Sequence, residues 1–153
     1  MRIDTAERMH SLGLALGGLL RAGDLVVLTG GLGAGKTTLT RGIGEGLGVR
    51  GPVTSPTFVI ARVHPPLAGG PPLVHVDAYR LGGFAEVDDL DLDADLAAAV
   101  TVVEWGEGLV EGLAEDRLEV RMSRVGDTES RDVTITGVGG RWAGSELNGI
   151  VPD

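Results

Sequence analysis

The sequence contains no cysteine, and this absence excludes three kinds of chemistry. Disulfide bonds, thiolate zinc sites and cysteine nucleophiles all need a thiol that this chain of 153 residues does not have. Any bound metal would therefore use oxygen or histidine ligands. The lack of disulfides is typical of a protein in a reducing compartment, so we expect a cytoplasmic location.

Basic residues are also few. The chain has 13 lysine and arginine residues against 22 aspartate and glutamate residues, and its formal net charge is −9. Proteins that bind nucleic acid tightly depend on lysine and arginine to release counterions from the phosphates. We therefore expect no direct, tight contact with RNA or DNA, and we expect a basic partner protein instead.

Long apolar runs are missing as well. The stretch LGLALGGLL near the start is too short to span a bilayer, and Asp4 and Glu7 are not typical of a signal peptide. No membrane association is expected. The length fits a single domain over residues 1–153, in which the weakly patterned residues from about 139 to 153 are expected to form a loose tail.

Lysine occurs once, within the most specific motif of the chain. Lys36 lies in GGLGAGKT, which satisfies the phosphate-loop pattern G-x-x-x-x-G-K-[ST]. In this motif small residues let backbone N–H groups point at phosphate oxygens, and the start of the following helix adds positive potential. The lysine bridges the β- and γ-phosphates, while Thr37 and Thr38 offer hydroxyls to Mg²⁺ and to the α-phosphate. The motif predicts a nucleotide-phosphate site.

The hydrophobic patterns predict an α/β fold. We expect a first helix that begins at an Asp4 cap and ends before Gly23. The other expected helices cover 36–47, part or all of 86–99, and 106–113, and the expected strands cover 24–29, 57–63, 72–79, 100–105, 117–122 and 131–137. Fully apolar runs at 25–28 and 100–103 favour buried parallel strands. The prediction is a three-layer α/β sandwich of the P-loop NTPase-like type, whose central, mostly parallel sheet has antiparallel strands at its edges.

Two carboxylates follow apolar strands and are candidates to complete the site. Asp77 in LVHVDAYR and Glu104 in VTVVEWGE would both lie at the carboxyl edge of a parallel sheet, where ligands usually bind. Each resembles the acid that ends a Walker B strand, although a carboxylate that only caps a strand at the surface is an open alternative for either one. We interpret His75 as a core histidine with satisfied nitrogens.

Four ordered blocks resemble the TsaE family over nearly the whole chain: GGLGAGKTTLTRGIGEGLGV, VTSPTF, HVDAYRL and VVEWGE, between an opening helix and a closing hairpin. The resemblance implies a P-loop ATPase that acts with two partner proteins, TsaD and TsaB. Together they make the threonylcarbamoyl modification on the adenosine next to the anticodon of certain tRNAs. Contact with tRNA would be indirect, through this complex.

The resemblance also implies ATP and Mg²⁺ as cofactors and assigns residues to them. The implied phosphate contacts are Gly33, Ala34, Gly35, Lys36, Thr37 and Thr38. The implied Mg²⁺ ligands are Thr37, Glu104 and Asp77, and the implied catalytic residues are Asp77, Glu104 and Lys36. The implied further nucleotide contacts are Thr5, Thr57, Trp105 and Arg131, of which Thr57 would be switch-like.

Competing nucleotide-binding functions are separated by what the chain lacks. A GTPase would select guanine with N-K-x-D, but the only asparagine is Asn148 and the only lysine is in the loop. A dinucleotide-binding fingerprint G-x-G-x-x-G is not completed after Gly31 or Gly33. A small-molecule kinase would need a lid rich in arginine, whereas residues 82–99 offer acids. The kinase and a scaffold that binds ATP without hydrolysing it stay open as alternatives.

Overall fold

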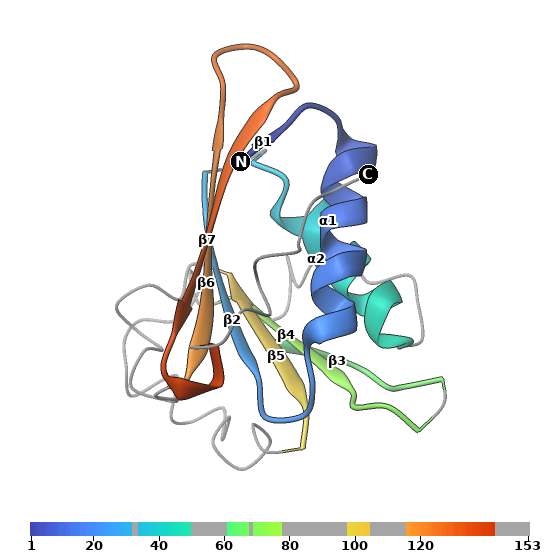
Figure 1. The fold of residues 1–153 in the computed structure, drawn as a ribbon. Helices are drawn as coiled ribbons and strands as arrows, with labels where there is room; N and C mark the ends of the chain where they lie inside the picture. The colour runs from blue at the N-terminus through green and yellow to red at the C-terminus, as the bar shows by residue number, and fades with distance from the viewer. Residues whose placement is uncertain (32–33, 50–60, 68, 78–97, 105–115, 143–153) are drawn as a thin grey trace.

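The structure is a computed structural model that describes residues 1–31, 34–49, 61–67, 69–77, 98–104 and 116–142. Seven described strands form one sheet, and the two described α-helices pack on one of its faces (Figure 1). The helices are α1 (Ala6–Leu19) and α2 (Lys36–Leu47), followed late in the chain by a short 3-10 helix, η3 (Gly140–Trp142). The strands are β1 (Arg2–Ile3), β2 (Leu25–Thr29), β3 (Ala61–His64), β4 (Leu73–Asp77), β5 (Val100–Glu104), β6 (Arg117–Arg124) and β7 (Arg131–Val138).

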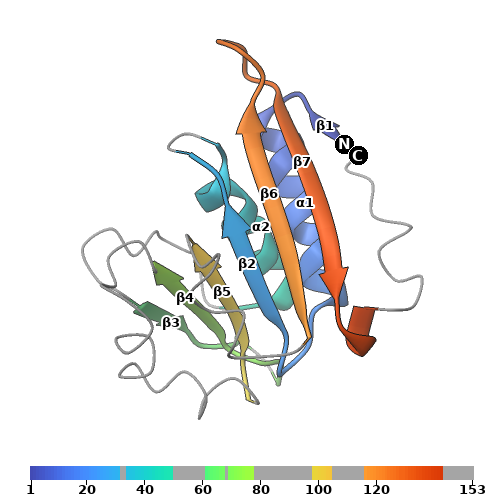
Figure 2. The ribbon, with the colours of Figure 1, turned by 90° about the vertical axis from the view of Figure 1, so that its left-hand side faces the viewer.

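The sheet is parallel at its centre and antiparallel at its edges. Its strand order is β1-β7-β6-β2-β5-β4-β3 (Figure 2). Strands β6, β2, β5 and β4 run parallel, while β7, β1 and β3 add antiparallel pairs outside them. This arrangement confirms the predicted parallel centre with antiparallel edges. The third layer of the predicted sandwich falls outside the described residues.

The hydrophobic core fills the space between the sheet and the two helices. Apolar residues at helical spacing on α1 and α2 meet every second residue of the central strands, as the sequence pattern predicts. The largest fully buried members include Leu12, Leu16, Leu28, Leu39, Ile43 and Leu118. The parts of the predicted strands and helices at 57–60, 86–97 and 106–113 lie outside the described residues.

Helix α1 begins one residue later than predicted. Thr5, and not Asp4, is the N-cap: its backbone is extended, and its Oγ1 accepts a hydrogen bond of 3.1 Å from the backbone N–H of Arg8. The Asp4 carboxylate instead accepts from Ser130 Oγ at 3.1 Å and pairs with the Arg8 guanidinium at 3.7 Å. The prediction was wrong at this position because a distant segment engages Asp4.

Helices α1 and α2 lie against each other backbone to backbone. A β-carbon on any of four glycines would overlap backbone atoms of the opposite helix; these are Gly13 and Gly17 on α1 and Gly42 and Gly46 on α2. Close-packed glycines let two helices approach more closely than larger residues allow. The contact places the start of α1 beside the start of α2, and therefore beside the candidate phosphate loop.

Two short elements near the ends of the described chain were not predicted. Strand β1 pairs with β7, and the ammonium group of Met1 donates to the Val133 carbonyl at 2.7 Å. Residues Gly140–Trp142 form η3, in which Trp142 is buried, so the expectation of a loose tail does not hold for these residues. Both elements are too short to carry a hydrophobic period.

Candidate functional site

The predicted phosphate loop connects β2 to α2, as the motif requires. Of its residues the structure describes Gly30, Gly31, Ala34 and Gly35. Gly35 is the N-cap of α2 with φ of 103°, a left-handed conformation that residues with a β-carbon rarely adopt. A β-carbon on Gly30 would lie 2.7 Å from the backbone carbonyl oxygen of Met122 on β6. The backbone path of the loop therefore requires glycine at both ends.

The start of α2 combines a lysine ammonium with a helix N-terminus that no side chain caps. Lys36 is buried, and its Nζ donates to the Gly30 carbonyl at 2.6 Å, so the ammonium reaches back to the first residue of the loop. No side chain caps α2, and its first turn contains no acidic residue. A helix start without a capping side chain, beside an ammonium, suits an anionic phosphate. Thr37 and Thr38 are half-buried in the same turn.

Glu104 lies at the loop edge, which is the end of the sheet formed by the carboxyl ends of the central strands, where β2 leads into the loop. It is the last residue of β5, and in the parallel pairing of β5 with β2 it stands opposite Leu28, close to the end of β2. Its carboxylate is buried, with 7% of the side chain exposed. Asp77 ends β4 and pairs in register with Glu104, although its side chain lies outside what the structure describes. The two predicted acids thus end neighbouring strands at the loop edge.

His75 does not match the sequence interpretation of a satisfied core histidine. It is fully buried on β4, and neither ring nitrogen has a hydrogen-bond partner among the residues that the structure describes. Its Nε2 lies 3.6 Å from Glu104 Oε2. The sequence contained one signal that His75 faces the candidate site. His75 and Asp77 are two residues apart on a strand, so their side chains share one face of the sheet.

The described residues fit Mg²⁺ only as a site that a nucleotide completes. No group of three or more histidine, aspartate or glutamate residues is arranged to hold a metal within the described ranges. Mg²⁺ in nucleotide sites commonly uses one or two protein oxygens and takes phosphate oxygens and water for the rest. The buried Glu104 carboxylate at the end of β5 and the Thr37 hydroxyl in the first turn of α2 have the chemistry that this mode of binding needs.

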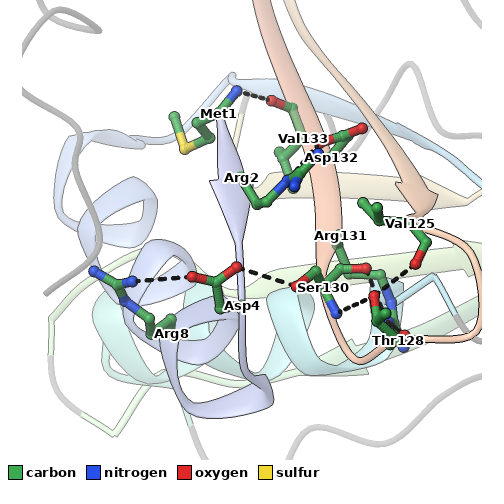
Figure 3. Close-up of polar contacts among 10 residues, drawn as sticks. All are labelled: Met1, Arg2, Asp4, Arg8, Val125, Thr128, Ser130, Arg131, Asp132 and Val133. Atoms are coloured by element: carbon green, nitrogen blue, oxygen red, sulfur yellow. Dashed lines mark hydrogen bonds and ion pairs between the residues drawn. The ribbon is translucent and has the colours of Figure 1, made fainter.

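Thr5 and Arg131 belong to neighbouring segments, because β1, which ends two residues before Thr5, pairs with β7 so that Ile3 stands opposite Arg131. The hydrogen bond between Ser130 and Asp4 joins the tip of the β6–β7 hairpin to the start of α1 (Figure 3). In this arrangement the Thr5 hydroxyl caps α1, and Arg131 Nη1 donates to the Thr128 and Ser130 carbonyls at 3.1 Å each. The fold therefore brings the two segments together, and their contact with a nucleotide stays a prediction.

Helix α1 also approaches the loop itself. A β-carbon on Gly35 would lie 3.2 Å from the terminal methyl group of Met9, so this buried side chain packs on the loop residue that begins α2. Three other predicted nucleotide contacts, Gly33, Thr57 and Trp105, lie outside the described residues. Within the described residues, no helix is both long enough and apolar enough to cross a bilayer.

Comparison with known proteins agrees with the resemblance seen in the sequence. The family described as "Threonylcarbamoyl adenosine biosynthesis protein TsaE" matches residues 3–133. The chain belongs to the TsaE family. A relative from Streptomyces coelicolor, named tRNA threonylcarbamoyladenosine biosynthesis protein TsaE, is 69% identical over 144 residues, which are 92% of this chain and 97% of the relative. A Bacillus subtilis protein of the same name is 43% identical over 80% of this chain and 75% of its own length.

The fold of this TsaE-family chain also matches a solved structure. The crystal structure of Bacillus subtilis YdiB superposes with a TM-score of 0.72 at 33% sequence identity. The superposition covers 93% of this chain and 86% of YdiB. The single mixed sheet with its helices is therefore shared with a solved protein over nearly the whole chain.

Proposed function

We propose that this chain acts in tRNA threonylcarbamoyladenosine biosynthesis as a Mg²⁺-dependent ATPase with the P-loop NTPase-like three-layer fold. The biosynthetic role follows the family and the names of its relatives. The ATPase rests on one observation: a glycine-bounded loop joins a buried parallel strand to a helix whose uncapped start carries Lys36. The proposal includes a soluble, cytoplasmic location, because the modified substrate of this biosynthesis is tRNA.

Each residue of the loop edge has a defined task in this proposal. Lys36 and the first N–H groups of α2 hold the β- and γ-phosphates of ATP, and Lys36 exchanges its bond to the Gly30 carbonyl for phosphate oxygens. Thr37, Glu104 and Asp77 bind Mg²⁺, which would neutralise charge on the transferred phosphoryl group. The two carboxylates also orient the attacking water, since they end adjacent strands.

The charge of the chain argues for hydrolysis within a complex. With a net charge of −9, the protein has little basic surface for tRNA, so tRNA would be reached through the partner proteins TsaD and TsaB. Arg41, which follows the loop on α2, is exposed. A partner that supplies or repositions a charge-neutralising group would raise turnover.

The test is the ATPase rate of the chain alone, with both partners, and with partners and tRNA, all at one salt concentration because association between charged surfaces is screened by salt. We expect slow hydrolysis alone and faster hydrolysis in the complex. ATP binding without hydrolysis in any mixture would favour a scaffold. Transfer of the γ-phosphate to a small molecule, with no response to the partners, would favour a kinase and overturn the proposal.

A further inference from the structure

The contact between His75 and Glu104 joins two neighbouring strands beneath the candidate metal site. His75 stands opposite Val102 in the parallel β4–β5 pair, so Glu104 is two residues farther along β5 on the same face of the sheet. The ring is fully buried, the carboxylate is nearly so, and Nε2 lies 3.6 Å from Oε2. The imidazole thus lies directly behind the carboxylate, on the side away from solvent.

A buried imidazole without hydrogen bonds needs an explanation, because buried polar groups in proteins almost always have partners. A neutral imidazole has one N–H donor and one acceptor nitrogen, and within the described part of the chain neither nitrogen of His75 has a hydrogen-bond partner. Leaving such groups unpaired costs free energy that an apolar residue at the same position would avoid. Packing alone therefore does not account for a histidine at this position.

The missing partner is within reach. Shortening the distance between Nε2 and Oε2 from 3.6 Å to a hydrogen bond of about 3.0 Å takes a movement of about 0.6 Å. Hydrogen bonds in catalytic sites are often long without ligand and tighten when the ligand binds. A small rotation of the Glu104 carboxylate is enough to form this one.

We infer that His75 is a positioning residue: it donates from Nε2 to Oε2 of Glu104 and so turns the second carboxylate oxygen toward the metal–nucleotide complex. The inference rests on the proposed function. Carboxylates and imidazoles that bind metals are themselves held by hydrogen bonds from residues behind them, and loss of such a bond typically lowers metal affinity by about 10- to 100-fold. Because both side chains are buried, the N–H group of His75 also fixes which rotamer the Glu104 carboxylate adopts.

Three substitutions separate positioning from packing. His75→Gln keeps an N–H donor at about the position of Nε2, His75→Asn moves the amide nitrogen to about the position of Nδ1, and His75→Leu keeps the volume without a donor. For each variant, thermal unfolding is recorded, and ADP affinity is measured by calorimetry with saturating Mg²⁺ and with EDTA. Mn²⁺ affinity of the ADP complex is measured by electron paramagnetic resonance.

We expect His75→Leu and His75→Asn to lower Mn²⁺ affinity by about 10- to 100-fold, His75→Gln to keep most of it, and ADP affinity in EDTA to be the same in all. The Leu variant should unfold at the same or a higher temperature, because it removes an unpaired buried group. Equal metal affinity in the Gln and Asn variants overturns the inference. If the Leu variant does not fold, the Gln and Asn pair alone decides.

Glu104→Gln is the matched reference for the size of the effect. Because His75 acts through Glu104, the double variant with His75→Leu should lose no more metal affinity than Glu104→Gln alone. Losses that add independently overturn the inference while leaving the metal site in place. If Glu104→Gln itself leaves the Mg²⁺ dependence of ADP binding unchanged, the metal site of the proposed function is wrong, and the inference fails with it.

Discussion

Two carboxylates at opposite ends of the central parallel strands are equally buried but have different surroundings. Asp24 precedes β2 and Glu104 ends β5, and each residue is 5% exposed. Asp24 receives two hydrogen bonds of 3.2 Å from the Arg141 guanidinium and one of 2.8 Å from the Arg21 backbone N–H. The contact that the structure describes for the Glu104 carboxylate is the imidazole of His75 at 3.6 Å.

The difference separates a carboxylate that stabilises the fold from one that, in the proposed site, binds a metal ion. A buried charge is tolerated when a charged, well-aligned partner compensates its loss of hydration. Arg141 provides this for Asp24, and it also donates to the Leu19 carbonyl at the end of α1 at 2.9 Å and lies over the Trp142 ring at 4.1 Å. Glu104 has no such cation within the described residues, and in the proposed site Mg²⁺ takes that place.

The largest expected effect is on nucleotide binding at the loop edge. Lys36→Ala should weaken binding of ATP with Mg²⁺ by about 1,000-fold, equivalent to about 4 kcal/mol, because in the proposed site the buried ammonium is the charged partner of the phosphates. Calorimetric titration of the folded variant measures this. Arg41→Ala, an exposed cation on the same helix, is the control and should bind as the parent does. Parent-like affinity in the folded Lys36 variant would end the phosphate-loop assignment.

Next in size is the effect on turnover at the same edge. Glu104→Gln and Asp77→Ala should each lower single-turnover hydrolysis by about 100-fold while changing metal-free ATP affinity little, because metal and water ligands act mainly in the transition state. The thermal midpoint of Glu104→Gln should not fall, since no lysine or arginine among the described residues pairs with the carboxylate. Hydrolysis at the parent rate in both variants would show that these are ordinary strand-end acids.

At the amino ends of the central strands, substitution of Asp24 should change stability and leave nucleotide binding unchanged. Asp24→Asn removes the charge from a buried ion pair with Arg141 and should cost about 3 kcal/mol, which lowers the melting temperature by about 6–12 °C. Asp132→Asn, in an exposed pair with Arg2, is the control and should cost less than about 1 kcal/mol. Both are measured by thermal and urea unfolding. A loss of ATP affinity in folded Asp24→Asn at low temperature would contradict the assignment of stability to Asp24 and of ligand binding to the loop edge.

The smallest expected effect is on the packing of α1 against α2. Helix α1 contacts Arg141 through the Leu19 carbonyl and the phosphate loop through Met9. Gly13→Ala would put a β-carbon against the Leu39 carbonyl on α2 and should cost about 1–3 kcal/mol. Gly18→Ala, on an exposed position of the same helix with open space around it, should instead stabilise by about 0.5–1 kcal/mol. Urea unfolding of the two variants gives the comparison. Equal changes would mean that the helices are less closely packed than described.

Local chemistry made part of this site predictable. The loop motif, the strand before it and the helix after it are contiguous, so their pattern in the sequence already specifies their geometry. The same holds for β6 and β7, whose alternating residues and short connection predicted a hairpin. Placing Asp77 and Glu104 at one edge needed only the rule that parallel strands end together, and the register confirms it.

Competition between neighbours on the chain was not predictable in the same way. Asp4 and Thr5 are both good helix caps, and the choice between them was made by Ser130, a residue of the distant hairpin that binds Asp4. Strand β1 likewise exists because β7 offers it an edge, since a two-residue strand has no pattern of its own.

The sequence by itself therefore determined the strand, glycine loop and helix of the candidate phosphate site, the order of the main strands and helices along the chain, and the family, because each depends on residues that are close together or on ordered motifs. The tertiary structure alone decided which partner each buried charge received. Arg141 reaches Asp24 across 117 positions of the chain, and His75 reaches Glu104 only because β4 and β5 are neighbours in the sheet. Buried electrostatic pairs depend on distance in space, and a pattern along the chain does not contain that distance.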